Sequence, residues 1–167
     1  MAPNTQSKAL HDDPDVNGEQ EIVRLEERHL HSMLVIEHSS FESPWCSGDF
    51  ESAFRDSRTL CLGLQLRGKL IGYAIGYLQI PPLHLANLAV GPEYRRRGYG
   101  LTLVQRIICE GVNAGCTGCT LEVRASNERA QRLYHVLGFE TIDVWPRHYS
   151  GPVEDGLIMY RGSKVNG

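Results

Sequence analysis

The most chemically suggestive segment of the chain is a run of three arginines and two glycines at 95–100. It follows the apolar stretch 83–90 and precedes an amphipathic pattern, so we expect it to join a buried strand to a helix. The first N–H groups of a helix lack partners within the helix, and the helix dipole adds partial positive charge there. Glycines admit a ligand close to the backbone, and arginines bond phosphate oxygens. The pattern predicts a pyrophosphate site, with a basic surface turn as the alternative.

Two familiar phosphate-binding motifs do not describe this segment. No Gly-Lys-Ser/Thr follows the glycines, so the segment is not a Walker loop. The third glycine of the dinucleotide fingerprint is also missing, and Val104 stands near its place.

Glu122 is a candidate general base. Side chains alternate along the predicted strand 119–124, so Glu122 points away from the apolar residues on either side of it. In a sheet covered by helices that face is partly desolvated, which suits a carboxylate acting near neutral pH. Periodicity alone also allows a glutamate at the rim of the sheet, paired with Arg124 or Arg129.

Tyr134 lies on the apolar stripe of a predicted helix between Ser126 and Gly138. It is therefore either a core aromatic or the donor of a proton to a bound ligand, because a buried tyrosine hydroxyl usually needs a partner. Cys116 and Cys119 have CxxC spacing but no second pair or histidine couple, so we interpret them as structural thiols and predict no metal site. His84 is interpreted as a core histidine, with the lining of a cleft as the alternative.

The remaining pattern supplies the elements that must position these residues. Strands are predicted at 21–25, 59–66, 70–79, 83–90, 119–124, 139–145 and 156–161. Helices are predicted at 26–38, at 48–55 after an N-cap at Ser47, from Leu101 to near Gly115, and after an N-cap at Ser126. Mixed strands with interspersed helices indicate an α/β sheet domain with helices on its faces.

Composition limits the class of protein. A chain of 167 residues fits one domain, and a net charge of −3 argues against a nucleic-acid or membrane binder. Five scattered cysteines and the lack of a secretory signal predict a reducing, cytoplasmic location. Residues 1–19 are expected to be a disordered lead-in, 20–162 the folded domain, and 163–167 a short tail.

The motifs together resemble those of the GNAT acetyltransferase superfamily. The Arg-x-x-Gly-x-Gly pattern at 95–100, after Asn-Leu-Ala-Val at 87–90, is similar to its acetyl-CoA motif. The runs 121–127, 133–134 and 137–139 look like the bacterial ribosomal-protein-alanine N-acetyltransferases, the RimI type. Glu37, Pro44-Trp45 and Phe50 resemble that subfamily's substrate-side helices, and 155–159 its closing strand. The resemblance covers about residues 20–160.

The resemblance implies a fold and a set of roles. The fold would be a mostly antiparallel sheet of about seven strands, with about four helices and a splayed strand pair at the cofactor site. Glu122 would be the general base and Tyr134 the general acid, and a backbone N–H, that of Leu88, would stabilise the oxyanion. The implied acetyl-CoA contacts are Leu88, Ala89, Val90, Arg96, Arg97, Gly98, Tyr99, Gly100, Leu101 and Asn127.

The acceptor implied by the resemblance is a protein N-terminus, in particular the N-terminal alanine of a small-subunit ribosomal protein, and the enzyme would be a monomer or weak dimer. Two stretches depart from the family pattern and leave other acceptors open. They are Pro82-Leu83 and 145–149, where a Tyr-Tyr pair is often seen. A small-molecule amine or a protein lysine is the alternative acceptor, and a non-catalytic acyl-CoA-binding module is the third hypothesis.

Overall fold

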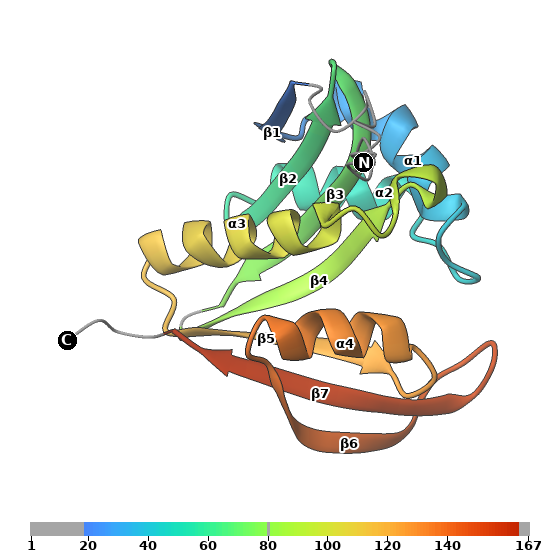
Figure 1. The fold of residues 1–167 in the computed structure, drawn as a ribbon, viewed down its shortest axis with the longest axis vertical. Coiled ribbons are helices and arrows are strands. Elements are labelled where there is room, and N and C mark those ends of the chain that lie inside the picture. The colour runs from blue at the N-terminus through green and yellow to red at the C-terminus, as the bar shows by residue number, and fades with distance from the viewer. Residues whose placement is uncertain (1–18, 80, 164–167) are drawn as a thin grey trace, which may run out of the picture.

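The structure, a computed structural model, describes residues 19–79 and 81–163 (Figure 1). The predicted lead-in and tail lie outside the described residues, apart from Glu19 and Ser163. In the described residues, no helix is long and apolar enough to cross a membrane.

Seven strands form one sheet in the order β1-β2-β3-β4-β5-β7-β6. Neighbouring strands are antiparallel throughout except for β4 and β5, which are parallel. This confirms the expected mixed, mostly antiparallel sheet. The strands are β1 Gln20–Arg24, β2 Thr59–Leu66, β3 Lys69–Leu78, β4 Pro82–Val90, β5 Gly118–Arg124, β6 Glu140–Tyr149 and β7 Glu154–Gly162.

Four α-helices cover the two faces of the sheet, and each face has its own hydrophobic core (Figure 1). One core contains Met33 of α1 and Phe50 of α2, and the other contains Leu103 of α3 and Tyr134 of α4. The helices are α1 Leu30–His38, α2 Ser47–Arg55, α3 Tyr99–Asn113 and α4 Glu128–Val136, with 3-10 turns at Glu27–His29 and Pro92–Tyr94.

All four α-helix starts differ from the sequence-based expectation. Helix α1 begins at Leu30 rather than at Glu26, because Glu27–His29 form a 3-10 turn. Helix α3 begins at Tyr99 rather than Leu101, because Gly98 adopts a left-handed conformation, φ +83°, and caps the helix directly. Asn127, not Ser126, caps α4, since its side-chain oxygen accepts a hydrogen bond from the N–H of Ala130 at 3.1 Å. Ser47 is the first residue of α2 and not its cap, which is Cys46.

Candidate active site

The parallel strands β4 and β5 separate partway along their length. Their pairing begins at Pro82, opposite Gly118, and ends at Leu85, opposite Leu121. A bulge lies at the same point of β4, because Leu85 faces Gly76 of β3 while Asn87 faces Ile75, leaving Ala86 as an extra residue. The strands open into a cleft of about 700 Å³ whose wall includes Leu88, Glu122, Asn127 and Tyr134.

Beyond the bulge, alternate backbone groups of β4 point toward the cleft. The N–H of Gly91 donates to the carbonyl of Ile71 in β3 at 2.8 Å. Because the direction of N–H groups reverses at each residue of a strand, those of Val90 and Leu88 point to the opposite edge, where β5 has moved away. This direction favours Leu88 and Val90 over Ala89 as backbone donors to a ligand lying in the cleft.

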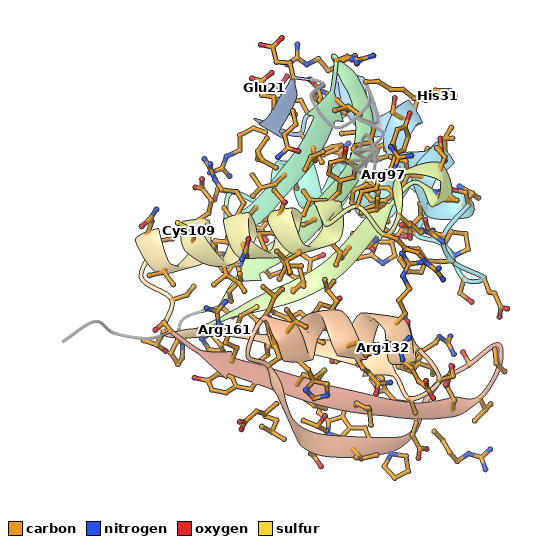
Figure 2. All side chains as sticks on the ribbon, in the orientation of Figure 1. Glu21, His31, Arg97, Cys109, Arg132 and Arg161 are labelled. Atoms are coloured by element: carbon orange, nitrogen blue, oxygen red, sulfur yellow. The ribbon has the colours of Figure 1, made fainter. Side chains whose placement is uncertain are left out.

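The turn before α3 has the features of an anion cradle. The first regular helical bond runs from the N–H of Thr102 to the carbonyl of Gly98 at 3.0 Å, so the N–H groups of Tyr99, Gly100 and Leu101 have no partner four residues earlier in the helix. Arg96 and Arg97 are exposed beside them, and Figure 2 shows Arg97 next to this turn. These groups fit a pyrophosphate, since they combine orphan donors, the positive end of a helix and flexible cations.

Gly100 connects this cradle to the cleft. A Cβ built on Gly100 would lie 3.7 Å from Leu133 of α4 and 3.8 Å from Val90 of β4. The helix α4 also supplies Ala130 and Tyr134 to the wall of the cleft. A ligand bound at the cradle can therefore extend between β4 and α4 into the cleft.

Arg95 has a different role from the two arginines that follow it. Its Nε donates to the carbonyl of Val90 at 2.9 Å, and its Nη2 donates to Ser40 Oγ at 2.9 Å. Arg95 thus links the end of β4 to the loop that follows α1, while Arg96 and Arg97 remain available to a phosphate.

Glu122 points into the cleft, and its partner is His148. Their side chains are 30% and 29% exposed, and His148 Nε2 lies 2.6 Å from Glu122 Oε2. The alternative of a pair with Arg124 or Arg129 is wrong for Arg124, whose carboxylate partner is Glu154 at 2.9 Å. The histidine was missed in the sequence because it lies 26 residues away, in a stretch whose only signal was its departure from the family pattern.

Tyr134 is buried in the core beneath the cleft and also contributes to the cleft wall. Its ring packs against Phe139 with centroids 5.7 Å apart. Burial raises the pKa of Tyr134, and the nearby Cys119 and Tyr149 raise it further, so the hydroxyl keeps its proton at neutral pH. The core-aromatic and proton-donor interpretations are therefore compatible.

A buried carboxylate forms the floor of the cleft near α1. Glu37 is 1% exposed and accepts hydrogen bonds from the backbone N–H of Trp45 at 2.8 Å, from the Tyr73 hydroxyl, and from the Asn87 amide. Burial, followed by the charge of Glu37, raises the pKa of Tyr73, which remains a donor. The resemblance singled out Glu37 as part of a substrate-side helix, but Tyr73 and Asn87 lie too far along the chain for any local pattern to reveal the network.

Other residues considered in the sequence lie outside the cleft. Leu83 is buried in the core, 3.1 Å from a Cβ built on Gly111, and neither Pro82 nor Leu83 lines the cleft. Cys116 and Cys119 are buried and unpaired, and burial raises the pKa of Cys119 to about 12. Within the part of the chain described, no three potential metal ligands cluster together.

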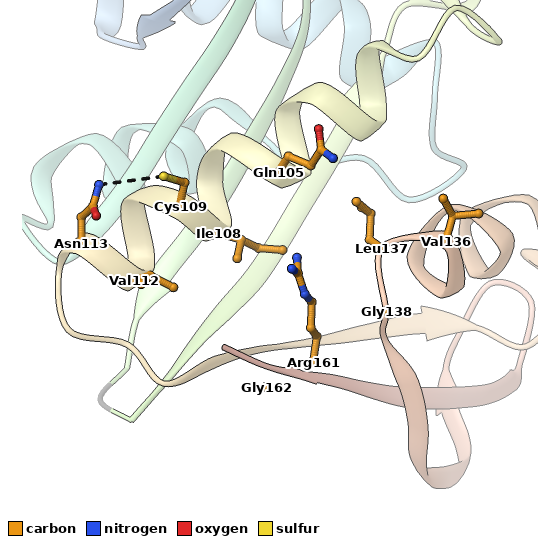
Figure 3. A pocket seen from close by; sticks show the side chains of 10 residues that line it. All are labelled: Gln105, Ile108, Cys109, Val112, Asn113, Val136, Leu137, Gly138, Arg161 and Gly162. Carbon is orange, nitrogen blue, oxygen red and sulfur yellow. Dashed lines mark hydrogen bonds between the residues drawn. The ribbon is translucent and has the colours of Figure 1, made fainter. Parts of the chain in front are cut away.

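A second cavity of about 680 Å³ lies along the C-terminal half of α3 (Figure 3). The side chain of Arg161 points from β7 toward α3, and Asn113 donates a weak hydrogen bond to the sulfur of Cys109 at 3.9 Å. The cavity contains none of the predicted site residues.

A sheet divided between β4 and β5, with an anion cradle at the following helix, defines a GNAT-type acyl-CoA-dependent acyltransferase. Residues 29–139 match the Acetyltransferase (GNAT) family, and the chain belongs to that family. It is therefore an acetyl-CoA-dependent N-acetyltransferase.

The chain is 35% identical over 140 residues to the ribosomal protein bS18-alanine N-acetyltransferase of Escherichia coli K12, covering 83% of this chain and 94% of that protein. The crystal structure of the Escherichia coli ribosomal-protein-S18-alanine N-acetyltransferase superposes with a TM-score of 0.82 at 32% identity, over 89% of this chain and 97% of the other. Arabidopsis thaliana NAA60 in complex with a bisubstrate analogue shares the fold, with a TM-score of 0.76 at 18% identity, over 86% and 99% of the two chains.

Proposed function

We propose that the protein transfers the acetyl group of acetyl-CoA to the α-amino group of a protein N-terminus, with the N-terminal alanine of a small-subunit ribosomal protein as acceptor. The single observation that carries the chemistry is the cleft at the splayed strands, because it contains both a carboxylate, Glu122, and a protonated phenol, Tyr134. The acceptor class is supported by the 35% identical relative that is named for bS18-alanine acetylation.

The co-substrate would lie along β4 and α4. Arg96 and Arg97 and the N–H groups of Gly98, Tyr99, Gly100 and Leu101 would hold the pyrophosphate. The backbone of β4, Leu88 to Val90, would hold the pantetheine arm. Asn127 would contact the co-substrate at the start of α4, where it lines the cleft. When bound in this way, acetyl-CoA supplies an activated acetyl thioester.

The residues of the chain then manage protons and charge around the acetyl transfer. Glu122 would accept a proton from the acceptor amine, so that the nitrogen lone pair is free to attack. The N–H of Leu88, which points toward the cleft, would donate to the thioester oxygen as negative charge develops on it. Tyr134 would give its proton to the departing sulfur.

The acceptor would enter between two segments far apart in the sequence. The loop after α1 contributes Phe41, Glu42 and Ser43 to the cleft, and the β6–β7 connection contributes Ser150 and Pro152. An opening framed by two surface loops can receive the end of an extended chain. A small amine or a lysine side chain remains the second candidate, because the unusual stretch 145–149 does reach the cleft through His148 and Tyr149.

The test is acetylation of a library of ribosomal-protein N-terminal peptides, read by mass spectrometry. We expect acetyl-CoA-dependent modification of the α-amino group of peptides that begin with alanine. Turnover with polyamines or internal lysines, and none with those peptides, would support the second candidate. Binding of acetyl-CoA without turnover of any amine would indicate a non-catalytic module.

A further inference from the structure

At the wall of the active-site cleft, His148 Nε2 lies only 2.6 Å from Glu122 Oε2. The pair joins β5 to the end of β6, where the register between β6 and β7 shifts between Trp145 and Tyr149. The family pattern often has a Tyr-Tyr pair in the stretch 145–149, which contains His148. In this chain an ionisable imidazole therefore contacts the carboxylate to which we assign the role of base.

The imidazole is held in position from several sides. A Cβ built on Gly156 of β7 would lie 2.8 Å from His148 Cδ2 and 3.1 Å from its Cβ, so the ring packs directly on the backbone of a glycine. The rings of Trp145 and Tyr149 meet His148 edge-on, with centroids 5.1 and 4.8 Å away. The contact with Glu122 is thus part of a packed arrangement and not a chance meeting of two mobile surface side chains.

Arg124 stabilises the connection that follows His148. Its guanidinium donates to the carbonyls of Ser150 and Pro152, each at 3.1 Å, and lies 4.5 Å from the centroid of the Tyr149 ring. It also pairs with Glu154, whose pKa is lowered by hydrogen bonds from Arg124 and Ser126. Arg124 and Glu154 neutralise each other, and the side chain in direct contact with Glu122 is that of His148.

We infer that His148 is a positioning residue for the acetyl transfer: its Nε2–H aims Glu122 at the acceptor amine while the imidazole is neutral, and its cationic form ties Glu122 into an ion pair. This inference rests on the proposed function. With Oε2 engaged by His148, Oε1 of Glu122 is the oxygen left to accept the amine proton. A carboxylate paired with a cation is a weaker base, so protonation of His148 slows the reaction.

The step balances without any further reactant. The amine gives one proton to Glu122, and its lone pair forms the new N–C bond while the C–S bond breaks and its electron pair leaves with sulfur. Sulfur takes the proton of Tyr134, and Tyr134 regains one from the acylated nitrogen. Glu122 returns its proton to water, so an acceptor that arrives as ammonium releases one proton in total.

Other titratable groups also face the pair, and the experiment must separate them from His148. They are His84 of β4, Arg124 of β5, Tyr149 of β6, Glu154 of β7 and Tyr134 of α4. Burial lowers the pKa of His84, an effect that Glu122 partly opposes, and His84 Nδ1 lies 3.2 Å from Thr120 Oγ1. His84 is the matched control, because it is a second histidine that feels the charge of Glu122.

The test compares kcat/KM of the full chain with that of His148→Gln, His148→Ala and His84→Gln from pH 5 to 9, with one acceptor amine throughout. When the kcat/KM of wild type is divided by that of a variant at the same pH, the effect of acceptor ionisation on the rate cancels. The kcat/KM of wild type divided by that of His148→Gln should fall as the pH is lowered, because a histidine can gain a proton and a glutamine cannot. His148→Ala, which lacks the donor, should lose roughly 10- to 100-fold at pH 8, an effect typical of a misaligned catalytic group.

At pH 8, His148→Gln should be much more active than His148→Ala, because the glutamine amide can still donate a hydrogen bond to Glu122. A ratio to His148→Gln that stays flat with pH would overturn the inference, since a purely structural histidine gives a constant factor. The inference would also be overturned if the ratio of wild-type kcat/KM to that of His84→Gln showed the same pH dependence, because the effect would then belong to His84.

Gly156→Ala supplies an independent variant that leaves His148 in place but crowds its ring. It should reproduce the pH 8 loss of His148→Ala, with the Kd for acetyl-CoA unchanged. Full activity of Gly156→Ala would contradict the positioning role. If Glu122→Gln kept wild-type turnover, the proposed base itself would fail, and that outcome is distinct from a failure confined to the His148 variants.

Discussion

The carboxylate of Glu37 accepts two hydrogen bonds from the side-chain amide of Asn87, at 3.2 and 3.3 Å. Asn87 is the first residue of β4 after the bulge that begins the splay, and Glu37 also accepts the backbone N–H of Trp45, at 2.8 Å. This one buried carboxylate therefore links α1, the segment leading into α2 and the diverging strand. The shape of the cleft depends on it.

Removal of the Glu37 carboxylate should destabilise the fold strongly. Glu37→Ala leaves the buried donors of Tyr73 and Asn87 and the half-buried N–H of Trp45 without an acceptor. We expect a loss of about 3 kcal/mol or more, since each such group costs roughly 1–3 kcal/mol. Tyr73→Phe, which removes only one donor, should cost about 1 kcal/mol. Urea denaturation measures both values, and equal stability of Glu37→Ala and wild type would exclude the network as a structural element.

Glu122→Gln should reduce kcat by about 100-fold or more, because general-base catalysis contributes roughly 10²- to 10⁴-fold. The Kd for acetyl-CoA should not change, because Glu122 lies on β5 and is not part of the cradle that follows β4. Glu140→Gln is the control, since Glu140 is an exposed strand glutamate of β6 that does not line the cleft. Steady-state kinetics with a thiol readout decide the matter, and similar losses for the two variants would argue for a general charge effect.

The phenol of Tyr134 should remain an effective acid at high pH. Its working form is protonated, and burial raises its pKa above the ordinary tyrosine value of 10. The kcat profile should therefore show no alkaline decrease attributable to Tyr134 below pH 10. Tyr134→Phe should lower kcat at all pH values.

Tyr149→Phe tests the other tyrosine that lines the cleft. Burial, and next the charge of Glu122, raises the pKa of Tyr149 to about 12, so it too stays protonated. A larger loss of kcat for Tyr149→Phe than for Tyr134→Phe would transfer the role of acid to Tyr149.

The three arginines of the turn should separate into two classes. Arg96→Ala and Arg97→Ala should each weaken binding of acetyl-CoA about 10-fold, since charge-assisted bonds to phosphate contribute roughly 1.5–3 kcal/mol at most sites and less where exposed. Thermal stability should be unchanged. Arg95→Ala should instead lower the Tm, because it removes the bonds to Val90 and Ser40. Calorimetry and thermal unfolding of the three variants provide the comparison, and a common effect would contradict this division.

The sequence predicted the elements that depend on local patterns. Every α-helix and strand was expected within a few residues, because apolar periodicity and glycine positions are readable along the chain. The start of α3 was placed two residues late, since only the three-dimensional turn shows that Gly98 takes φ +83° and ends the loop. Ser126 was predicted to cap α4 because of its residue type. In the structure its hydroxyl and its N–H instead donate hydrogen bonds to the carboxylate of Glu154, at 3.0 Å each.

The contacts that complete the site were beyond the reach of the sequence. Glu122 and Tyr134 were predicted as base and acid from their motif, and the structure brings both to one cleft. His148 and Tyr73 join their partners across 26 and 36 residues of sequence, and no periodic pattern encodes such distances. Leu83 shows the reverse limit, because one of the departures that suggested the acceptor side is a side chain buried in the core.

The most direct test of the account uses one peptide that begins with alanine and contains an internal lysine, together with the same peptide blocked at its N-terminus. Both are incubated with the protein and acetyl-CoA, and the modified site is located by tandem mass spectrometry. The account predicts a single acetyl group on the α-amino nitrogen of the free peptide and none on the blocked peptide. Acetylation of the lysine at equal rates in both peptides would contradict it.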